Sequence, residues 1–229
     1  MSHSRHALTL LCFEQVNIPA GQKAALEVGN KLVPISSLDM VGQTAFKNTK
    51  SLNRIQSIVC DAAYRSSENL LVCAPTGAGK TNVAMLCILQ AIRQHMDGDV
   101  IKRDNFKIVY VAPMKALAAE MADNFGKRLA PLGIVVRELT GDMSLTKTEI
   151  MQTQMLITTP EKWDVVTRKP GDVSLTQLVR LLIIDEVNDT LFKILDRQII
   201  RNFFNHSKVH LLHGDRGPVV EALVARTLR

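Results

Sequence analysis

Short apolar runs that alternate with stretches of helical periodicity constrain the fold of this chain more than any other feature. The predicted strands cover residues 69–74, 106–112, 134–139, 155–159 and 181–185. The predicted helices cover residues 51–64, 80–95, 116–129 and 174–180, and Ser51 is the expected cap of the first. Strands buried on both faces of a sheet read as continuous apolar runs, and parallel neighbours need crossover helices. The pattern therefore predicts an α/β fold with a mostly parallel sheet and helices on both of its faces.

Residues 1–50 lack this alternation. Pro19, Gly21, Gly29 and Pro34 occur there without a clear period, so we expect an irregular leader before a domain that spans residues 51–229. The longest apolar runs contain about five residues, far fewer than the ~20 of a bilayer-spanning helix, and no membrane partner is expected. The formal net charge of +6 suits a polyanionic partner but does not by itself demonstrate one.

A glycine-rich loop stands between a predicted strand and a predicted helix. Its residues are Ala74, Pro75, Thr76, Gly77, Ala78, Gly79, Lys80 and Thr81. The order matches the phosphate-binding loop, except that Ala74 replaces the first glycine. The glycines let successive backbone N–H groups point at phosphate oxygens, and the helix that follows adds the positive end of its dipole. Lys80 would reach the β- and γ-phosphates of a nucleotide, and Thr81 would offer its hydroxyl to Mg²⁺.

The last predicted strand ends in two carboxylates, Asp185 and Glu186. Acidic residues at strand ends are common solvated caps, and that interpretation stays open when these two are taken alone. About 100 residues after a phosphate-binding loop, with an alternating pattern between, they favour a catalytic role. The first acid would hold the Mg²⁺, and the second would take a proton from the attacking water. Lys80, Asp185 and Glu186 are therefore the predicted catalytic residues, with Thr81 and Asp185 as metal ligands.

Six motifs occur along the chain in the order and at the spacing of a known family. They are Leu52–Gln56, Ala74–Thr81, Ala112–Leu117 with Glu120, Thr140–Asp142, Thr159–Asp164 and Asp185–Val187. On these residues the chain resembles the first motor domain of a superfamily 2 helicase of the Ski-two-like branch. The resemblance implies a RecA-like domain that uses ATP and Mg²⁺ in a DExH-type machine for unwinding duplexes. It also implies subunits of a cointegrator-type complex as partners and a location in the nucleus and cytoplasm.

The resemblance assigns roles that spacing alone does not. It implies that Gln56 reads the adenine edge with Phe46 as a stacking partner, although Gln56 taken alone would be an ordinary polar residue of an amphipathic helix. It places a single strand or duplex of nucleic acid along Pro113, Lys115, Thr140, Gly141, Thr159 and Pro160. Backbone N–H groups and hydroxyls at strand ends hold phosphates without reading bases, so this binding would be independent of sequence. Trp163 is predicted to pack in the core rather than to stack on bases.

The acidic motif departs from the family at residue 188. The family has histidine there, whereas this chain has Asn188, and the expected continuation His-Leu-Leu-His-Gly-Asp-Arg-Gly-Pro is displaced to residues 210–218. We interpret residues 188–209 as an insertion, and a natural variant of the motif stays as the alternative. Apolar residues at positions 191, 192, 195, 199 and 203 predict an amphipathic helix inside it.

The chain ends at Arg229, before the Ser-Ala-Thr motif and the second motor domain of the resembled family. We therefore expect an α/β domain that is incomplete at its C-terminus and no second RecA-like domain. In the family the missing strand lies between the phosphate-loop strand and the acidic strand, so a gap with unpaired backbone groups is expected there. Two functions stay open: the ATP-binding lobe of a helicase, and a non-catalytic nucleotide- or nucleic-acid-binding fragment that interferes with the complete machine.

Overall fold

The structure is a computed structural model, and it describes residues 31–141, 145–168, 173–187 and 190–194 together with two short strands near the N-terminus. Those strands, β1 (Leu8–Leu10) and β2 (Phe13–Gln15), pair antiparallel within a unit of residues 1–31. A second unit spans residues 32–229 and contains the α/β domain.

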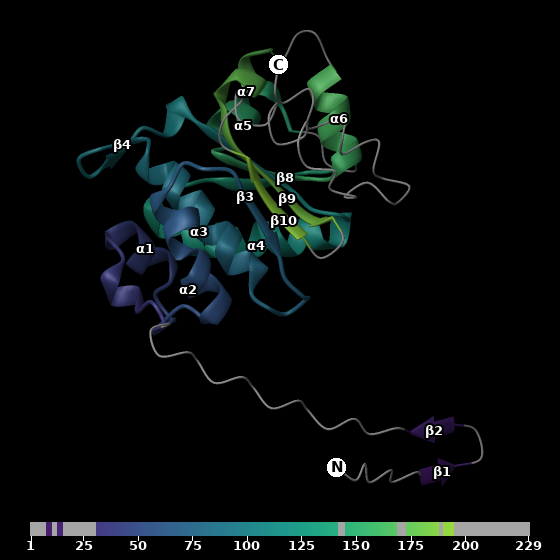
Figure 1. Cartoon of the computed structure of the whole chain (residues 1–229). Coiled ribbons are helices and arrows are strands. Elements are labelled where there is room, and N and C mark those ends of the chain that lie inside the picture. Colours follow the sequence, from purple (N-terminus) through teal and green to yellow (C-terminus); the bar gives the residue numbers. More distant parts are fainter. Residues whose placement is uncertain are drawn as a thin grey trace. The chain divides into compact units, whose positions relative to one another are not determined.

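A mixed sheet forms the centre of the second unit (Figure 1). Its strands are β3 (Leu70–Cys73), β6 (Lys107–Val111), β7 (Val136–Leu139), β8 (Met155–Thr158), β9 (Val179–Val187) and β10 (Thr190–Ile194). Among the described residues they follow the order β3-β10-β9-β6-β8-β7. The strands from β9 to β7 are parallel to one another, which confirms the predicted mostly parallel sheet. The five predicted strands correspond to β3, β6, β7, β8 and β9.

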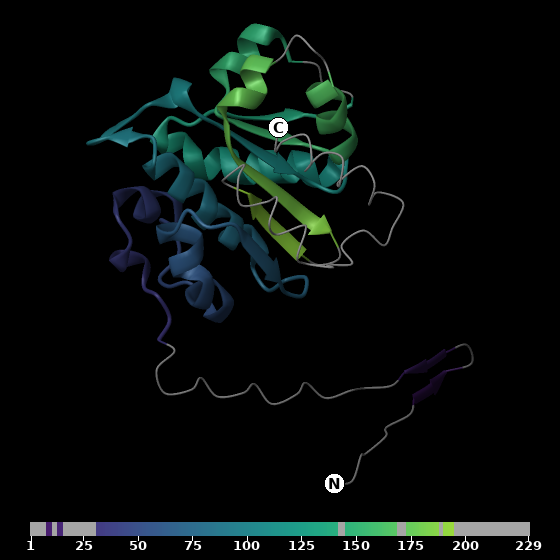
Figure 2. The ribbon, with the colours of Figure 1, turned by 45° about the horizontal axis from the view of Figure 1, so that its top comes forward.

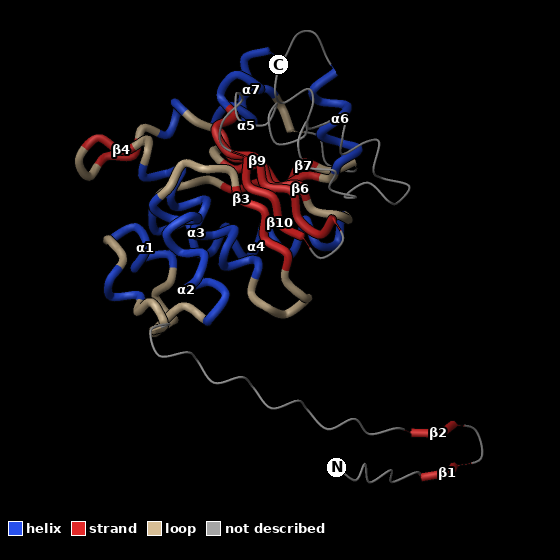
Figure 3. Tube along the Cα trace, viewed as in Figure 1, coloured by secondary structure: helices blue, strands red, loops and turns tan. Residues whose placement is uncertain are grey.

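Strand β10 occupies the place where the sequence predicts a gap (Figure 3). It pairs antiparallel with both neighbours, and Thr190 lies opposite Cys73 of β3 and Val187 of β9. Two predictions are therefore wrong: the described strands leave no gap between β3 and β9, and residues 190–194 form a strand rather than part of a helix. The facing edges of β3 and β9 need hydrogen-bond partners, and a nearby segment rich in β-branched and aromatic residues supplies them. The rest of the predicted helix, residues 195–209, lies outside the described residues.

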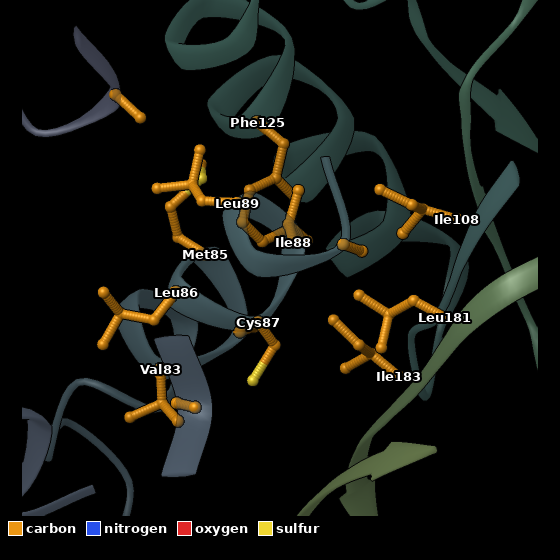
Figure 4. Packing of buried hydrophobic residues seen from close by; sticks show 14 of the residues in the cluster. Val83, Met85, Leu86, Cys87, Ile88, Leu89, Ile108, Phe125, Leu181 and Ile183 are labelled. Carbon is orange, nitrogen blue, oxygen red and sulfur yellow. The ribbon is translucent and has the colours of Figure 1, made fainter. Parts of the chain in front are cut away.

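Helices cover both faces of the sheet (Figure 2). On one face α3 (Lys80–Arg93) and α4 (Lys115–Leu129) pack against alternate residues of the strands, such as Ile108 and Ile183. Figure 4 shows Ile88 and Phe125 from these helices close to the strand residues. The opposite face packs against α6 (Pro160–Arg168) and α7 (Val173–Leu178).

The remaining described elements are short. They are α1 (Met40–Ala45), α2 (Arg54–Cys60), α5 (Lys147–Gln152), the π-helix η2 (Asp61–Arg65), the 3-10 helices η1 (Ile35–Ser37), η3 (Arg103–Asn105) and η4 (Ala130–Leu132), and the paired strands β4 (Met96–Asp97) and β5 (Val100–Ile101). No helix in the described part of the chain has the length and apolar character needed to cross a bilayer.

The leader ends earlier than the sequence predicts. Residues 32–50 belong to the second unit, and Val41 and Phe46 are buried in its main core. Asp39 caps α1 by accepting from the Gly42 N–H at 3.0 Å and forms an ion pair with Arg93 of α3 at 2.5 Å. The predicted boundary near residue 50 is therefore corrected to residues 31–32, because apolar residues without a clear period still bury themselves against α3 and α4.

Candidate nucleotide-binding site

The phosphate-binding loop connects β3 to α3, as the sequence predicts. Gly79 is the N-cap of α3 with a φ of 92°, and Gly77 has a φ of 81°. Both angles lie in the left-handed region that glycine adopts without strain. No side chain caps α3, so a glycine-rich loop leads directly into an open helix N-terminus. This arrangement is the one that binds phosphate groups through backbone amides and the helix dipole.

Lys80 crosses the loop from the first position of α3. It is buried, and its Nζ donates a hydrogen bond to the Ala74 carbonyl at 2.7 Å. The ammonium group therefore lies against the backbone of the loop, where it would neutralise the charge of bound phosphates. Thr81 follows and is half-buried, whereas Pro75 and Thr76 are exposed.

Two amide side chains at the start of α2 hold the far side of the loop. Asn53 Nδ2 donates to the Ala78 carbonyl at 2.9 Å, and Gln56 Nε2 donates to the Gly79 carbonyl at 3.2 Å. A Cβ on Gly79 would collide with Gln56 Nε2 and approach Asn53 Nδ2 to 2.9 Å, so glycine is needed there for close approach as well as for φ. Gln56 thus lies at the loop, and its reading of an adenine edge stays a prediction.

The same two residues fix the start of α2 by a capping box. Asn53 Oδ1 accepts from the Gln56 N–H, and Gln56 Oε1 accepts from the Asn53 N–H, both at 2.9 Å. The cap is therefore Asn53, which corrects the expected Ser51. Sequence reasoning missed Asn53 as a residue of the site, although the Asn-x-x-Gln spacing of a capping box was a visible signal.

The register of the sheet brings the loop and the acidic strand to one edge. Strands β3 and β9 are both antiparallel to β10, so they run in the same direction, and Cys73 and Val187 face each other across Thr190. Two strand spacings separate the ends of β3 and β9 by about 10 Å. Asp185, two residues before Val187, is therefore near the loop that carries Lys80.

Asp185 is half-buried and contacts a buried tyrosine on the neighbouring strand. Its Oδ2 accepts a hydrogen bond from the Tyr110 hydroxyl of β6. Sequence reasoning missed Tyr110, whose only signal was a hydroxyl inside the otherwise apolar run Ile-Val-Tyr-Val. Glu186 continues β9, and its side chain lies outside the described residues, as do Asp142, Asn188 and the displaced segment 210–218.

The candidate nucleic-acid residues follow the carboxyl ends of three parallel strands. Val111 of β6 and Leu139 of β7 both lie opposite Thr158 of β8, so the three strand ends are level. Lys115 and Gly141 are exposed and close together, since a Cβ on Gly141 would lie 3.4 Å from Lys115 Nζ. The structure therefore brings the predicted nucleic-acid residues to the edge that also carries Asp185.

Three of those residues turn their side chains into the protein. Thr140 is buried and donates its hydroxyl to Glu138 Oε1 at 2.6 Å, and Thr159 and Pro160 are also buried. Pro113 is half-buried. Of the six candidate nucleic-acid residues, Lys115 and Gly141 are the exposed ones in this structure. The surface available to a phosphate backbone is therefore smaller than the six residues together would provide.

Two aromatic predictions have opposite outcomes. Phe46 is 1% exposed, and the Arg128 guanidinium lies 4.7 Å from its ring centroid, so its predicted role as an adenine-stacking partner is wrong for this conformation. The cause is tertiary: Arg128 also donates to the Ala45 carbonyl at 3.1 Å and to Asn82 Oδ1 at 2.9 Å, which closes α4 over the ring. Trp163 is fully buried, which confirms the prediction that it packs in the core.

The donor set suits a magnesium nucleotide. Mg²⁺ is usually held by one or two carboxylates with substrate phosphates and waters completing its shell, rather than by a cage of protein ligands. Among the described residues no group of three or more His, Cys, Asp or Glu side chains is placed to hold a metal. One carboxylate, Asp185, one hydroxyl, Thr81, and a phosphate-binding loop are the groups that such an ion needs from the protein.

Comparison with known proteins places this site in a family. The model of the DEAD/DEAH box helicase family matches residues 53–214 of this chain. Activating signal cointegrator 1 complex subunit 3 of Homo sapiens is 60% identical over 218 residues, which cover 95% of this chain and 9% of the human protein. The DExH-box ATP-dependent RNA helicase DExH14 of Arabidopsis thaliana is 54% identical over 95% of this chain and 9% of its own length. The chain thus spans about a tenth of these relatives and has the helicase resemblance that its motifs predicted.

Solved structures agree on the fold. The DUF1998 helicase MrfA bound to DNA and AMPPNP superposes with a TM-score of 0.55 at 23% identity, over 69% of this chain and 22% of that one. At that identity the likeness concerns the fold, which is RecA-like. With a family match over most of its length, the chain belongs to the DEAD/DEAH box helicase family.

Proposed function

We propose that this chain provides the ATP-binding first lobe of a DExH-type nucleic-acid helicase. The observation that carries the proposal is the shared edge of the sheet, where register places the glycine-rich loop and Asp185 on strands about 10 Å apart. A loop for phosphates next to a carboxylate for the metal is the minimum that phosphoryl transfer from a magnesium nucleotide requires.

Each side chain has a separate part in that chemistry. Lys80 would leave the Ala74 carbonyl, 2.7 Å away, for the β- and γ-phosphate oxygens. Thr81 and Asp185 would hold Mg²⁺, which neutralises charge that develops on the phosphates when it is bound. Glu186 would accept the proton of the attacking water, and Gln56 would exchange its bond to the Gly79 carbonyl for the adenine edge.

The nucleic acid would lie across the ends of β6, β7 and β8. Lys115, at the exposed start of α4, would neutralise a phosphate, and the backbone near Gly141 allows a strand to approach closely. We further propose partners of the cointegrator-complex type, on the strength of the relatives' names. A nuclear and cytosolic location is proposed from the family resemblance alone.

A non-catalytic role is the second candidate, because the acidic motif departs from the family after Val187. Strand β10 starts three residues after Val187, within the stretch that departs. We propose that residues 188–209 are inserted between Val187 and His210, which would otherwise adjoin. Such an insertion separates Asp185 and Glu186 from the histidine that completes the acidic motif in the family. A chain interrupted in this way would still bind nucleotide but would not couple binding to nucleic acid.

Titration with a fluorescent ADP analogue tests the main proposal. Lys80→Ala should abolish binding, whereas Lys127→Ala removes an exposed lysine of α4 and should leave the affinity unchanged. Equal titration curves for wild type and Lys80→Ala would refute the phosphate-loop assignment. If wild type binds nucleotide but its hydrolysis is not stimulated by single-stranded nucleic acid, and deletion of residues 188–209 within a complete helicase restores stimulation, the non-catalytic candidate is favoured.

A further inference from the structure

A buried tyrosine on β6 is directed at the carboxylate to which the proposed function assigns the metal. The chain has two tyrosines, and Tyr110 is fully buried on the face of the sheet that packs against α3 and α4. Its hydroxyl donates to Asp185 Oδ2. The two residues are 75 positions apart in sequence, so this contact exists only because β6 and β9 are neighbours.

The register explains how the phenol reaches the edge. Tyr110 lies opposite Ile183 in the parallel pair of β6 and β9, and Asp185 is two residues further along on the same face of β9. A phenol is long enough to extend along the strand by that distance, whereas a serine or threonine hydroxyl at the same position is too short.

Packing fixes the ring. The Tyr110 ring meets Phe125 of α4 edge to face, with centroids 5.3 Å apart and an interplanar angle of 60°. Edge-to-face contacts of this kind in a close-packed interior leave the ring few alternative rotamers. The hydroxyl is therefore held in one place, and the carboxylate that accepts from it is restricted in turn.

We propose that Tyr110 is a positioning residue for the metal site and orients Asp185 toward the cation of a bound magnesium nucleotide. A carboxylate has about four lone-pair positions, so a bond from Tyr110 to one of them leaves others for a metal shell. Partners that orient a metal ligand in this way typically change metal affinity by about 10- to 100-fold when they are removed. This inference rests on the proposed function, because it needs Asp185 to bind the metal.

The alternative explanation is that a buried hydroxyl needs an acceptor and Asp185 is the nearest one. The other tyrosine provides a matched control for it. Tyr64 is 2% exposed and donates to Asp39 Oδ1 at 2.5 Å, so it too is a buried phenol bonded to a carboxylate. Asp39 pairs with Arg93 at the far end of α3, about 20 Å along the helix from Lys80 at a rise of 1.5 Å per residue.

Binding of Mn²⁺, measured by electron paramagnetic resonance in the presence of ADP, separates the two explanations. Tyr110→Phe, which removes only the hydroxyl, should weaken Mn²⁺ binding by about 10-fold, and excess Mn²⁺ should restore full occupancy. Tyr64→Phe should lower the melting temperature by about as much as Tyr110→Phe does. Its Mn²⁺ affinity should stay within about twofold of wild type. Thermal melts without metal or nucleotide verify that each variant folds.

Asp185→Asn separates failure of this inference from failure of the proposed function. If Asp185→Asn weakens Mn²⁺ binding and Tyr110→Phe does not, Tyr110 is only a structural residue and the inference is overturned. If Asp185→Asn binds Mn²⁺ as wild type does, the proposed metal site itself is wrong and the role of Tyr110 is refuted with it.

Discussion

Strand β9 has two unlike flanks. On one side β6, β8 and β7 continue the sheet in parallel, and their ends carry the candidate nucleic-acid residues. On the other side β10 runs antiparallel and joins β9 to β3, which carries the phosphate-binding loop. The parallel flank is built on β6 and β8, which are buried along their whole length, with the half-buried strand β7 outside them. The antiparallel flank depends on which segment reaches the open edge, so the two flanks differ in how strongly the sequence specifies them.

The two flanks also carry different candidate sites, with the nucleotide loop on one side of β9 and the nucleic-acid residues on the other. Asp185 lies on β9, between the nucleotide loop of one flank and the exposed Lys115 of the other. The bond from Tyr110 of β6 links this acid to the parallel flank, while register through β10 links it to the loop. A change on either flank is thus expected to reach Asp185 through its neighbours in the sheet.

The largest expected effect comes from the parallel flank. Leu156 of β8 is fully buried against Trp163, so Leu156→Ala should lower the free energy of unfolding by about 2 to 5 kcal/mol. Urea denaturation measures the change. Val165 on α6 is 51% exposed, and Val165→Ala should alter stability by less than about 0.5 kcal/mol. Similar losses in both variants would mean that the parallel flank is not close-packed.

The antiparallel flank is tested by a proline. Lys193 of β10 lies between Leu70 and Ile183, so Lys193→Pro removes a donor from a central strand. Leaving a buried carbonyl unsatisfied costs about 1 to 3 kcal/mol, and the unfolding free energy should fall by that amount. Lys193→Thr keeps the backbone N–H and should match wild type. If the proline variant is as stable as the threonine variant, β10 is not a central strand in solution.

A smaller effect sharpens the link between α2 and the loop. Asn53→Ala removes the N-cap of α2 and the bond to the Ala78 carbonyl, and should lower stability by about 1 kcal/mol and also weaken nucleotide binding. Asn53→Asp keeps the capping oxygen but loses the donor to Ala78. The aspartate variant should therefore recover stability without recovering affinity, as measured by thermal melts and nucleotide titration. Recovery of both would show that Asn53 acts only as a cap.

The last effect is confined to alkaline pH and concerns the start of β6, at the amino-terminal end of the parallel strands. Lys107 at the start of β6 is fully buried, and its Nζ donates to the Met151 and Thr153 carbonyls at 2.5 Å each. Burial lowers its pKa from the usual 10.5, partly offset by Asp104. The unfolded chain then binds more protons than the folded one between the lowered pKa and 10.5, so stability contributed by this residue rises with pH through that window.

Lys107→Met should remove this rise. The slope of unfolding free energy against pH would fall in the variant by at most about 1.4 kcal/mol per pH unit, the value for one proton. Urea titrations from neutral pH to pH 10.5 give the slope, and Lys127→Met, at an exposed ion pair of α4, serves as the control. If the unfolding free energy of Lys107→Met depends on pH as that of wild type does, the lowered pKa of Lys107 is contradicted.

Local sequence determined the loop, the strands of the parallel flank and the position of the acids. The apolar runs of β6, β8 and β9 are buried on both faces of the sheet. Gly77 and Gly79 permit the left-handed turns of the loop. These are properties of short segments, so periodicity and spacing predict them.

Only the tertiary structure decided the rest, because those features depend on residues far apart in the chain. Residues 190–194 have an apolar pattern compatible with a helix, and the unpaired edges of β3 and β9 make them a strand. The Phe46 ring is buried under the Arg128 guanidinium, and Tyr110 bonds to Asp185 although the two are 75 positions apart. Hydrogen bonds and packing between distant segments are fixed by the register of the sheet, and no single segment of the sequence contains that register.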